Sequence, residues 1–223
     1  MKKFLTPLFL CLVTLCFVSA AFATPLVQST FDTDDEGWRV GFLFDVTGFP
    51  ATPTYIASGG NPGGFIRTAD LFGWNAYIAP AQFLGNQSAA FGGSLDFDLR
   101  VLSAGPTAFY AVVLEGNGLQ VGYNDGIPTT AWTPFSIPLN NTGWFKNLNG
   151  VTGIGGTPIT SAELQSVLAN LTALRIDADW QTGSDQVDLD NVSLNSGVVP
   201  VPPTVLLLGS GLLGLAGWRL RRR

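Results

Sequence analysis

Two stretches of this sequence, 95–101 and 174–180, alternate between apolar and polar side chains at every position. A period of two places neighbouring side chains on opposite faces of an extended strand, so each stretch predicts a β-strand with one buried face. Glycine-rich turns separate further candidate strands at 38–44, 64–69, 76–79, 109–114, 119–123, 135–139 and 186–194. Many short strands with this punctuation predict an all-β fold, a jelly-roll β-sandwich.

One segment departs from the strand pattern and predicts a short helix. Thr160 precedes Glu163 by three residues, which is the spacing of a capping box at a helix N-terminus. The apolar residues that follow fall on one helical face, and they are Leu164, Val167, Leu168 and Leu171.

The N-terminus has the order of a secretory signal. The basic pair Lys2 and Lys3 is followed by an apolar run to Val18 and then by Ala21-Phe22-Ala23, a small-x-small cleavage pattern. We therefore predict that residues 1–23 form a signal helix, that signal peptidase removes it, and that the remaining chain is exported.

The C-terminus carries a second targeting pattern. Residues 196–204 are a proline-rich linker, and 205–223 begin with an uncharged apolar stretch. This stretch approaches the length of a membrane span, and cations beside a span favour its cytoplasmic end. We expect a transmembrane helix over 205–223 that ends in the cations Arg219, Arg221, Arg222 and Arg223.

The motif Pro200-Val201-Pro202, followed by the apolar stretch and the arginines, resembles the PEP-CTERM sorting signal of exported proteins in Gram-negative bacteria. Val201 stands where the commonest form has Glu, so the match is to the Val-Pro-x-Pro variant. The resemblance implies cleavage by an exosortase near this motif. It also implies a precursor held transiently in the inner membrane, then release to the cell surface or extracellular matrix.

The composition between these ends excludes several chemistries. Both cysteines lie in the predicted signal, and the chain has no histidine, so Ser-His-Asp, Cys-His and His-metal sites are absent. Residues 24–198 hold five basic and sixteen acidic residues, a net charge of −11. Such a surface repels nucleic acid and is compatible with divalent cations and neutral polysaccharides.

Acidic residues recur two positions apart, at Asp96/Asp98, Asp177/Asp179 and Asp188/Asp190. Residues i and i+2 share one strand face, so such a pair suits acid/base work on a glycosidic bond. Alternatively, the pairs are the solvated faces of half-buried strands. The apolar phase slips between Leu189 and Val192, which predicts a bulge near Asp190.

Aromatic residues near predicted loops are candidates for a sugar-stacking platform, and they are Trp74, Tyr123, Trp132 and Trp144. The alternative is that they belong to the core, as we expect for Trp38 and Trp180, which lie inside strand patterns.

The middle of the chain also resembles the laminin B (domain IV) module, over 31–194. The resemblance is carried by Glu36-Gly37-Trp38, by the glycine-rich 59–66, by 79–88 and by Leu189-Asp190-Asn191-Val192. It implies a non-catalytic jelly roll related to carbohydrate-binding modules, spanning 24–195 here. Such jelly rolls often hold a structural calcium between the first strand and the end of the last. By resemblance its ligands would be Asp32 and Asp190, with Asp34 or Asp188 as further candidates. The alternative is a plain hydrogen-bonded turn near Asp190 and Asn191.

Three functions are consistent with the sequence. The first is a non-catalytic, exported surface or matrix module that binds exopolysaccharide or other biofilm matrix components. The second is a carbohydrate-active enzyme that uses the paired aspartates. The third is an adhesive structural domain without a small ligand.

Overall fold

The computed structural model describes residues 25–44, 50–71, 73–102, 110–124, 126–148, 155–181 and 183–197. All of them belong to one compact unit, Ala23–Val199. The predicted signal helix, the sorting motif and the predicted C-terminal membrane helix lie outside the described residues. No helix within the described ranges is long and apolar enough to cross a membrane.

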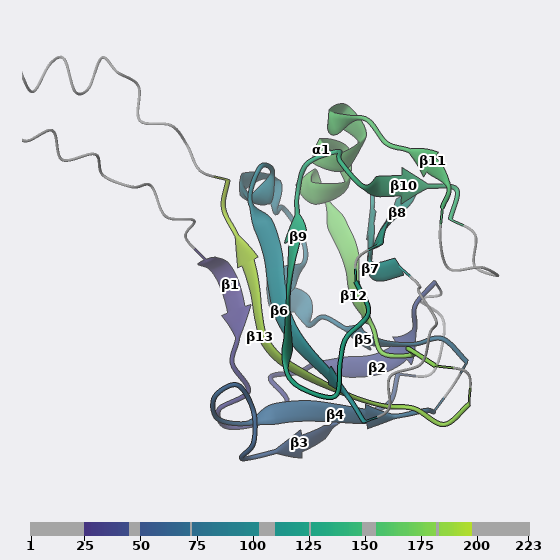
Figure 1. The fold of residues 1–223 in the computed structure, drawn as a ribbon. Coiled ribbons are helices and arrows are strands. Elements are labelled where there is room, and N and C mark those ends of the chain that lie inside the picture. Colours follow the sequence, from purple (N-terminus) through teal and green to yellow (C-terminus); the bar gives the residue numbers. More distant parts are fainter. Residues whose placement is uncertain are drawn as a thin grey trace, which may run out of the picture. The chain divides into compact units, whose positions relative to one another are not determined.

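The described strands form two antiparallel sheets (Figure 1). The first has the order β3 (Thr54–Ile56), β4 (Phe65–Ala69), β13 (Gln186–Asn195), β6 (Ser94–Val101) and β9 (Thr133–Pro138), with β1 (Pro25–Ser29) also pairing with β13. The second has the order β11 (Thr157–Pro158), β10 (Trp144–Lys146), β8 (Leu119–Asn124), β7 (Tyr110–Gly116), β12 (Leu171–Asp177), β5 (Asn75–Ile78) and β2 (Arg39–Phe42).

The two alternating stretches form β6 and β12 as predicted, one in each sheet. Their apolar positions, such as Phe97 and Ile176, are buried between the sheets in one hydrophobic core. Trp38 and Trp180 are fully buried in the same core, as the strand patterns predicted. The sandwich is therefore held together by the inward faces of both sheets.

The second alternating strand is shorter than its pattern. Strand β12 ends at Asp177, whereas the alternation continues to Trp180. The side chain of Asp177 accepts a hydrogen bond from the N–H of Asp179, and Ala178 donates to the carbonyl of Asn75. The second bond still joins the chain to β5, whereas the local bond from Asp179 to Asp177 competes with the ladder and ends the strand.

The predicted helix is α1 (Ser161–Ala169), and both bonds of its capping box with Thr160 and Glu163 are formed. It ends at Ala169 with Asn170 as its C-cap, so Leu171 opens β12 and does not extend the apolar face of the helix. Leu171 instead exchanges backbone hydrogen bonds with Gly85. Two short 3-10 helices, η1 (Ala81–Phe83) and η2 (Ser88–Ala90), precede β6.

The predicted bulge is present in β13. The register of β13 against β6 shifts between Asp190 and Ser193, and Asn191 has a positive φ of 52°. The bulge restores the apolar phase, since Leu189 and Val192 both face the core.

Candidate functional site

The outer face of the first sheet carries a buried carboxylate between two arginines. Asp188 on β13 pairs with Arg67 on β4 and with Arg100 on β6, so all three side chains share one face. Its Oδ1 lies 2.5 Å from Arg67 Nε and its Oδ2 lies 2.7 Å from Arg100 Nη2. Asp188 is fully buried, while the two arginine side chains are 25% and 23% exposed. The hydrogen bond to Asp188 raises the pKa of Arg67.

Two aromatic rings enclose this arginine pair. The guanidinium of Arg100 lies 4.4 Å from the ring centroid of Trp132 and 5.1 Å from that of Phe65. Arg67 lies 5.3 Å from the Phe65 ring. We call Phe65, Arg67, Arg100, Trp132 and Asp188 the arginine stack. Cation–π contact of this kind fixes the plane of each ring.

Trp132 is the half-buried end of the arginine stack. Its indole N–H donates to the carbonyl of Gly59 at 3.1 Å, and its ring meets Phe65 edge-on at 5.5 Å. The hydrogen bond and the stacked arginine leave the indole little freedom to rotate. Trp132 is therefore a pre-oriented aromatic surface of the kind that a flat apolar ligand face requires.

A loop from Gly59 to Gly64 lies beside the arginine stack and covers Asp190. The backbone N–H of Asn61 donates to Asp190 Oδ2 at 2.5 Å, and its side chain donates to Asp98 at 3.2 Å. A Cβ on Gly60 would lie 2.6 Å from Asp190 Oδ2, so the loop needs glycine there to approach so closely.

Burial raises the pKa of Asp190 to about 6, and the charges of Asp98 and Asp32 act in the same direction. The N–H groups of Asn61 and Asn191 oppose this rise. The hydrogen bond that Asp190 accepts from the N–H of Asn61 ties the loop to β13.

The laminin B (domain IV) family profile matches residues 76–205. The chain belongs to the laminin B (domain IV) family. It is 32% identical over 196 residues to human laminin subunit gamma-2, which covers 81% of this chain and 14% of that subunit. The chain thus spans about a seventh of the length of this relative.

The L4b domain of human laminin alpha-2 has the same fold, with a TM-score of 0.60 at 14% identity over 79% of this chain and 98% of that chain. This confirms the predicted jelly-roll sandwich. A family 30 carbohydrate-binding module aligns less closely, with a TM-score of 0.46 at 13% identity over 79% of this chain and 90% of that chain.

The four predicted calcium ligands are only partly brought together: Asp32 and Asp190 both border the loop from Gly59 to Gly64, and the charge of Asp32 acts on Asp190. Asp188 is paired with two arginines, so its carboxylate is compensated and the calcium prediction for it is wrong. Asp34 accepts the N–H of Glu36 at 2.8 Å, and Asp32 accepts the hydroxyl of Thr30. Across the described ranges, no three acidic side chains are arranged to hold a metal ion. A calcium site at Asp32 and Asp190 stays a prediction.

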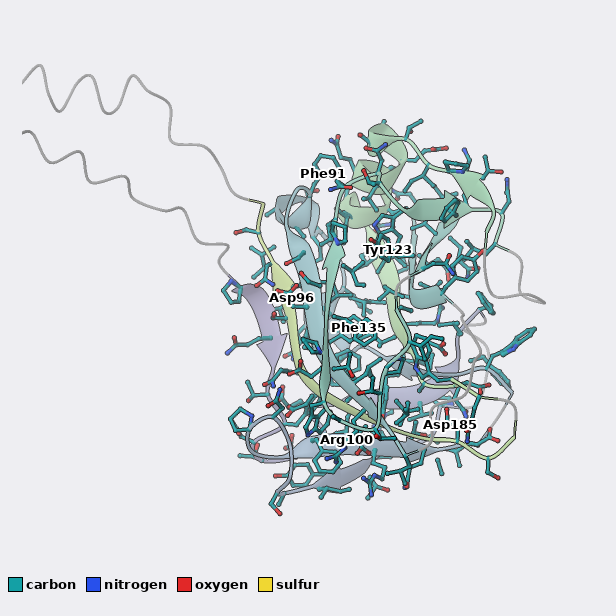
Figure 2. All side chains as sticks on the ribbon, in the orientation of Figure 1. Phe91, Asp96, Arg100, Tyr123, Phe135 and Asp185 are labelled. Atoms are coloured by element: carbon teal, nitrogen blue, oxygen red, sulfur yellow. The ribbon has the colours of Figure 1, made fainter. Side chains whose placement is uncertain are left out.

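The four predicted aromatic residues lie in separate places. Trp144 is fully buried and donates its indole N–H to the carbonyl of Pro138, so it is a core residue and cannot stack on a ligand. Tyr123 packs against Trp144 at 5.3 Å, well away from Arg100 in Figure 2. Trp74 lies beside Phe44 near the second sheet. Of the four, only Trp132 belongs to the arginine stack.

The paired aspartates have partners that fix the fold. Asp96 accepts from Ser136 and from Asn195, each at 2.7 Å. Asp98, Asp177 and Asp179 are 9%, 1% and 8% exposed, so the expectation of solvated faces is wrong for these three residues. Asp98 accepts from the side chains of Asn61 and Asn191, which lie far from it in the sequence, so the alternation alone does not reveal its burial.

Proposed function

We propose that this laminin B module is a non-catalytic binding domain whose Trp132 surface holds polysaccharide of a cell surface or extracellular matrix. The observation that carries the proposal is the fixed indole, stacked at 4.4 Å on Arg100 and bonded to Gly59. The C–H face of a sugar ring buries apolar area on such an indole. Binding then costs little conformational entropy, because the ring is already ordered.

The bonding of the aspartates supports a non-catalytic role. A glycosidase needs one carboxyl group free to protonate the leaving oxygen and a second to act on the sugar or on water. In this module Asp96 and Asp98 accept from Ser136, Asn195 and two asparagine amides, and Asp188 is neutralised by arginine. Among the described residues, Asp96, Asp98 and Asp188 therefore do not offer a free carboxylate pair for catalysis.

Replacement of Trp132 with alanine is expected to weaken polysaccharide binding roughly 30-fold, the usual cost of losing a central tryptophan. A glycan array followed by titration of the full chain measures this. Trp132→Phe keeps a ring and should lose less. Phe91 lies far from the labelled Arg100 in Figure 2, so Phe91→Ala should bind as the original does. Binding that survives Trp132→Ala, or release of reducing sugar, would contradict the proposal.

The proposed role includes sorting. The predicted signal 1–23 delivers the chain to signal peptidase, and an exosortase removes the tail after the motif at Pro200-Val201-Pro202. The inner membrane holds the precursor only until that cleavage. The extracellular setting of laminin subunits is consistent with such a destination. Mass spectrometry of surface material is expected to find a C-terminus near Pro202, and an intact Arg223 there would exclude processing.

A further inference from the structure

Exposed side chains follow the outer face of β9, an edge strand of the first sheet. Among the described strands β9 pairs with β6 only, and its outward positions are Pro134, Ser136 and Pro138. Proline cannot donate a hydrogen bond to an incoming strand, so these prolines protect the edge against further strand pairing. Trp132 precedes Pro134 by two residues, and both Pro134 and Ser136 are exposed. The accessible face of β9 therefore continues directly from the arginine stack.

Asp96 lies beside Ser136 on this face. The two residues are opposite each other in the ladder between β6 and β9. Asp96 Oδ1 accepts the hydroxyl of Ser136 and Asp96 Oδ2 accepts the side-chain amide of Asn195, each at 2.7 Å. The same amide lies 3.2 Å from Ser193 Oγ and 3.3 Å from Ser94 Oγ. These bonds fix the plane of the carboxylate without neutralising it, because both donors are uncharged.

The carboxylate of Asp96 can accept further hydrogen bonds. An ionised carboxylate offers about four lone-pair positions, and the two bonds to side chains use one on each oxygen. Asp96 is half-buried, and it forms no ion pair with a lysine or arginine that the structure describes. Asp188 on the same sheet face is, by contrast, fully buried and neutralised by two arginines. Asp96 is therefore a fixed and partly exposed acceptor for O–H donors.

The separation between the arginine stack and Asp96 suits an oligosaccharide. Asp96 and Arg100 are four positions apart on β6, a separation of about 13 Å at roughly 3.3 Å per residue. Figure 2 labels the two residues at different levels of the first sheet. The exposed Pro134 lies between these levels on β9, opposite Asp98. A short sugar chain that follows β9 can therefore contact Trp132, Pro134 and Asp96 together.

We infer that Asp96 and Ser136 form a second subsite of the Trp132 surface, and that the bound polysaccharide is a neutral chain of rings with equatorial hydroxyls, such as a β-1,4-linked glucan. The inference rests on the proposed polysaccharide-binding function and names its ligand class. Equatorial hydroxyls leave the ring faces apolar, as stacking on an indole requires, and place adjacent O–H groups at the ring edge. Two adjacent hydroxyls can donate to the two oxygens of Asp96 in charge-assisted hydrogen bonds. The negative charge of Asp96 and of the whole domain repels a chain of uronic acids.

Titration of the full chain with cellohexaose and cellobiose tests the inference. Cellohexaose can reach Trp132 and Asp96 together, whereas cellobiose on Trp132 is too short to reach Asp96. Asp96→Ala is expected to weaken cellohexaose binding about tenfold, the usual cost of a lost hydrogen bond to a charged group, and to leave the weaker binding of cellobiose unchanged. Ser136→Ala releases one bond to the carboxylate and should lose less. Asp35→Asn changes a carboxylate in the loop before β2, so it should bind both sugars as the original does.

A hexamer of β-1,4-linked glucuronic acid has the same linkage with negative charges, and it is expected not to bind. Cellohexaose binding that depends on Trp132 but not on Asp96 would overturn the inference and leave the proposed function standing. Cellohexaose that binds no better than the acidic hexamer would also overturn it, and the glycan array then decides the proposed function alone. Equal losses of cellobiose and cellohexaose binding in Asp96→Ala, checked against a thermal melt, would show a structural role for Asp96 and no subsite.

Discussion

Replacement of Asp188 with alanine is expected to lower the free energy of unfolding by about 3–5 kcal/mol, because it removes one partner from a buried ion pair. Arg67 and Arg100 would then face each other across β13 without the carboxylate that separates them. For a domain of this size the loss corresponds to a melting temperature lower by roughly 10 °C. Thermal and urea denaturation of the full chain measure both quantities.

Asp96→Ala is the matched control, since Asp96 lies on the same outer face and is bonded to neutral side chains only. Loss of those bonds is expected to cost about 1 kcal/mol. The Asp188 variant should also weaken Trp132-dependent glycan binding, because Arg100 loses the anchor that orients it under the indole. Equal stability of the two variants would show that the arginines do not depend on Asp188.

The sequence predicted the strands that carry the arginine stack, but it did not predict which of their side chains would meet. Alternation located β6, β12 and most of β13, because a period of two is a local property of the chain. The partners of Asp188 are Arg67 and Arg100, 121 and 88 residues earlier, so no local pattern indicates that they meet. The same holds for Asp98, which accepts from the side chains of Asn61 and Asn191.

Burial of single aromatic residues was the weakest inference from the sequence. Trp144 lies in β10, a strand of three residues that alternation cannot detect, and it is buried where a loop position was expected. Trp132 lies one position before β9, just before the chain enters the sheet. At this position the indole ring can turn onto the outer face. By contrast, the bulge at Asn191 was predictable, because a strand whose apolar phase slips needs an extra residue to keep both halves facing the core.

Trp38→Ala is expected to lower the free energy of unfolding by about 3–5 kcal/mol, the usual cost of truncating a large buried ring. Trp38 is fully buried and meets Phe31 and Phe83 edge-on at 6.2 and 5.4 Å. Its indole N–H donates to Ser29 Oγ at 3.0 Å, which joins β1 to the chain just before β2. The measurement is urea denaturation, with the midpoint and slope compared with those of the original chain.

Trp38→Phe separates the contribution of ring volume from that of the hydrogen bond to Ser29. Trp132→Ala compares a surface indole with the core indole of Trp38. Trp38→Phe keeps most of the ring and removes the bond to Ser29, so its cost should be about 1–2 kcal/mol. Trp132→Ala removes a half-buried indole, and it should reduce stability less than Trp38→Ala while reducing glycan binding more. If Trp132→Ala reduced stability more than Trp38→Ala and reduced glycan binding less, the ligand surface could not be assigned to the arginine stack.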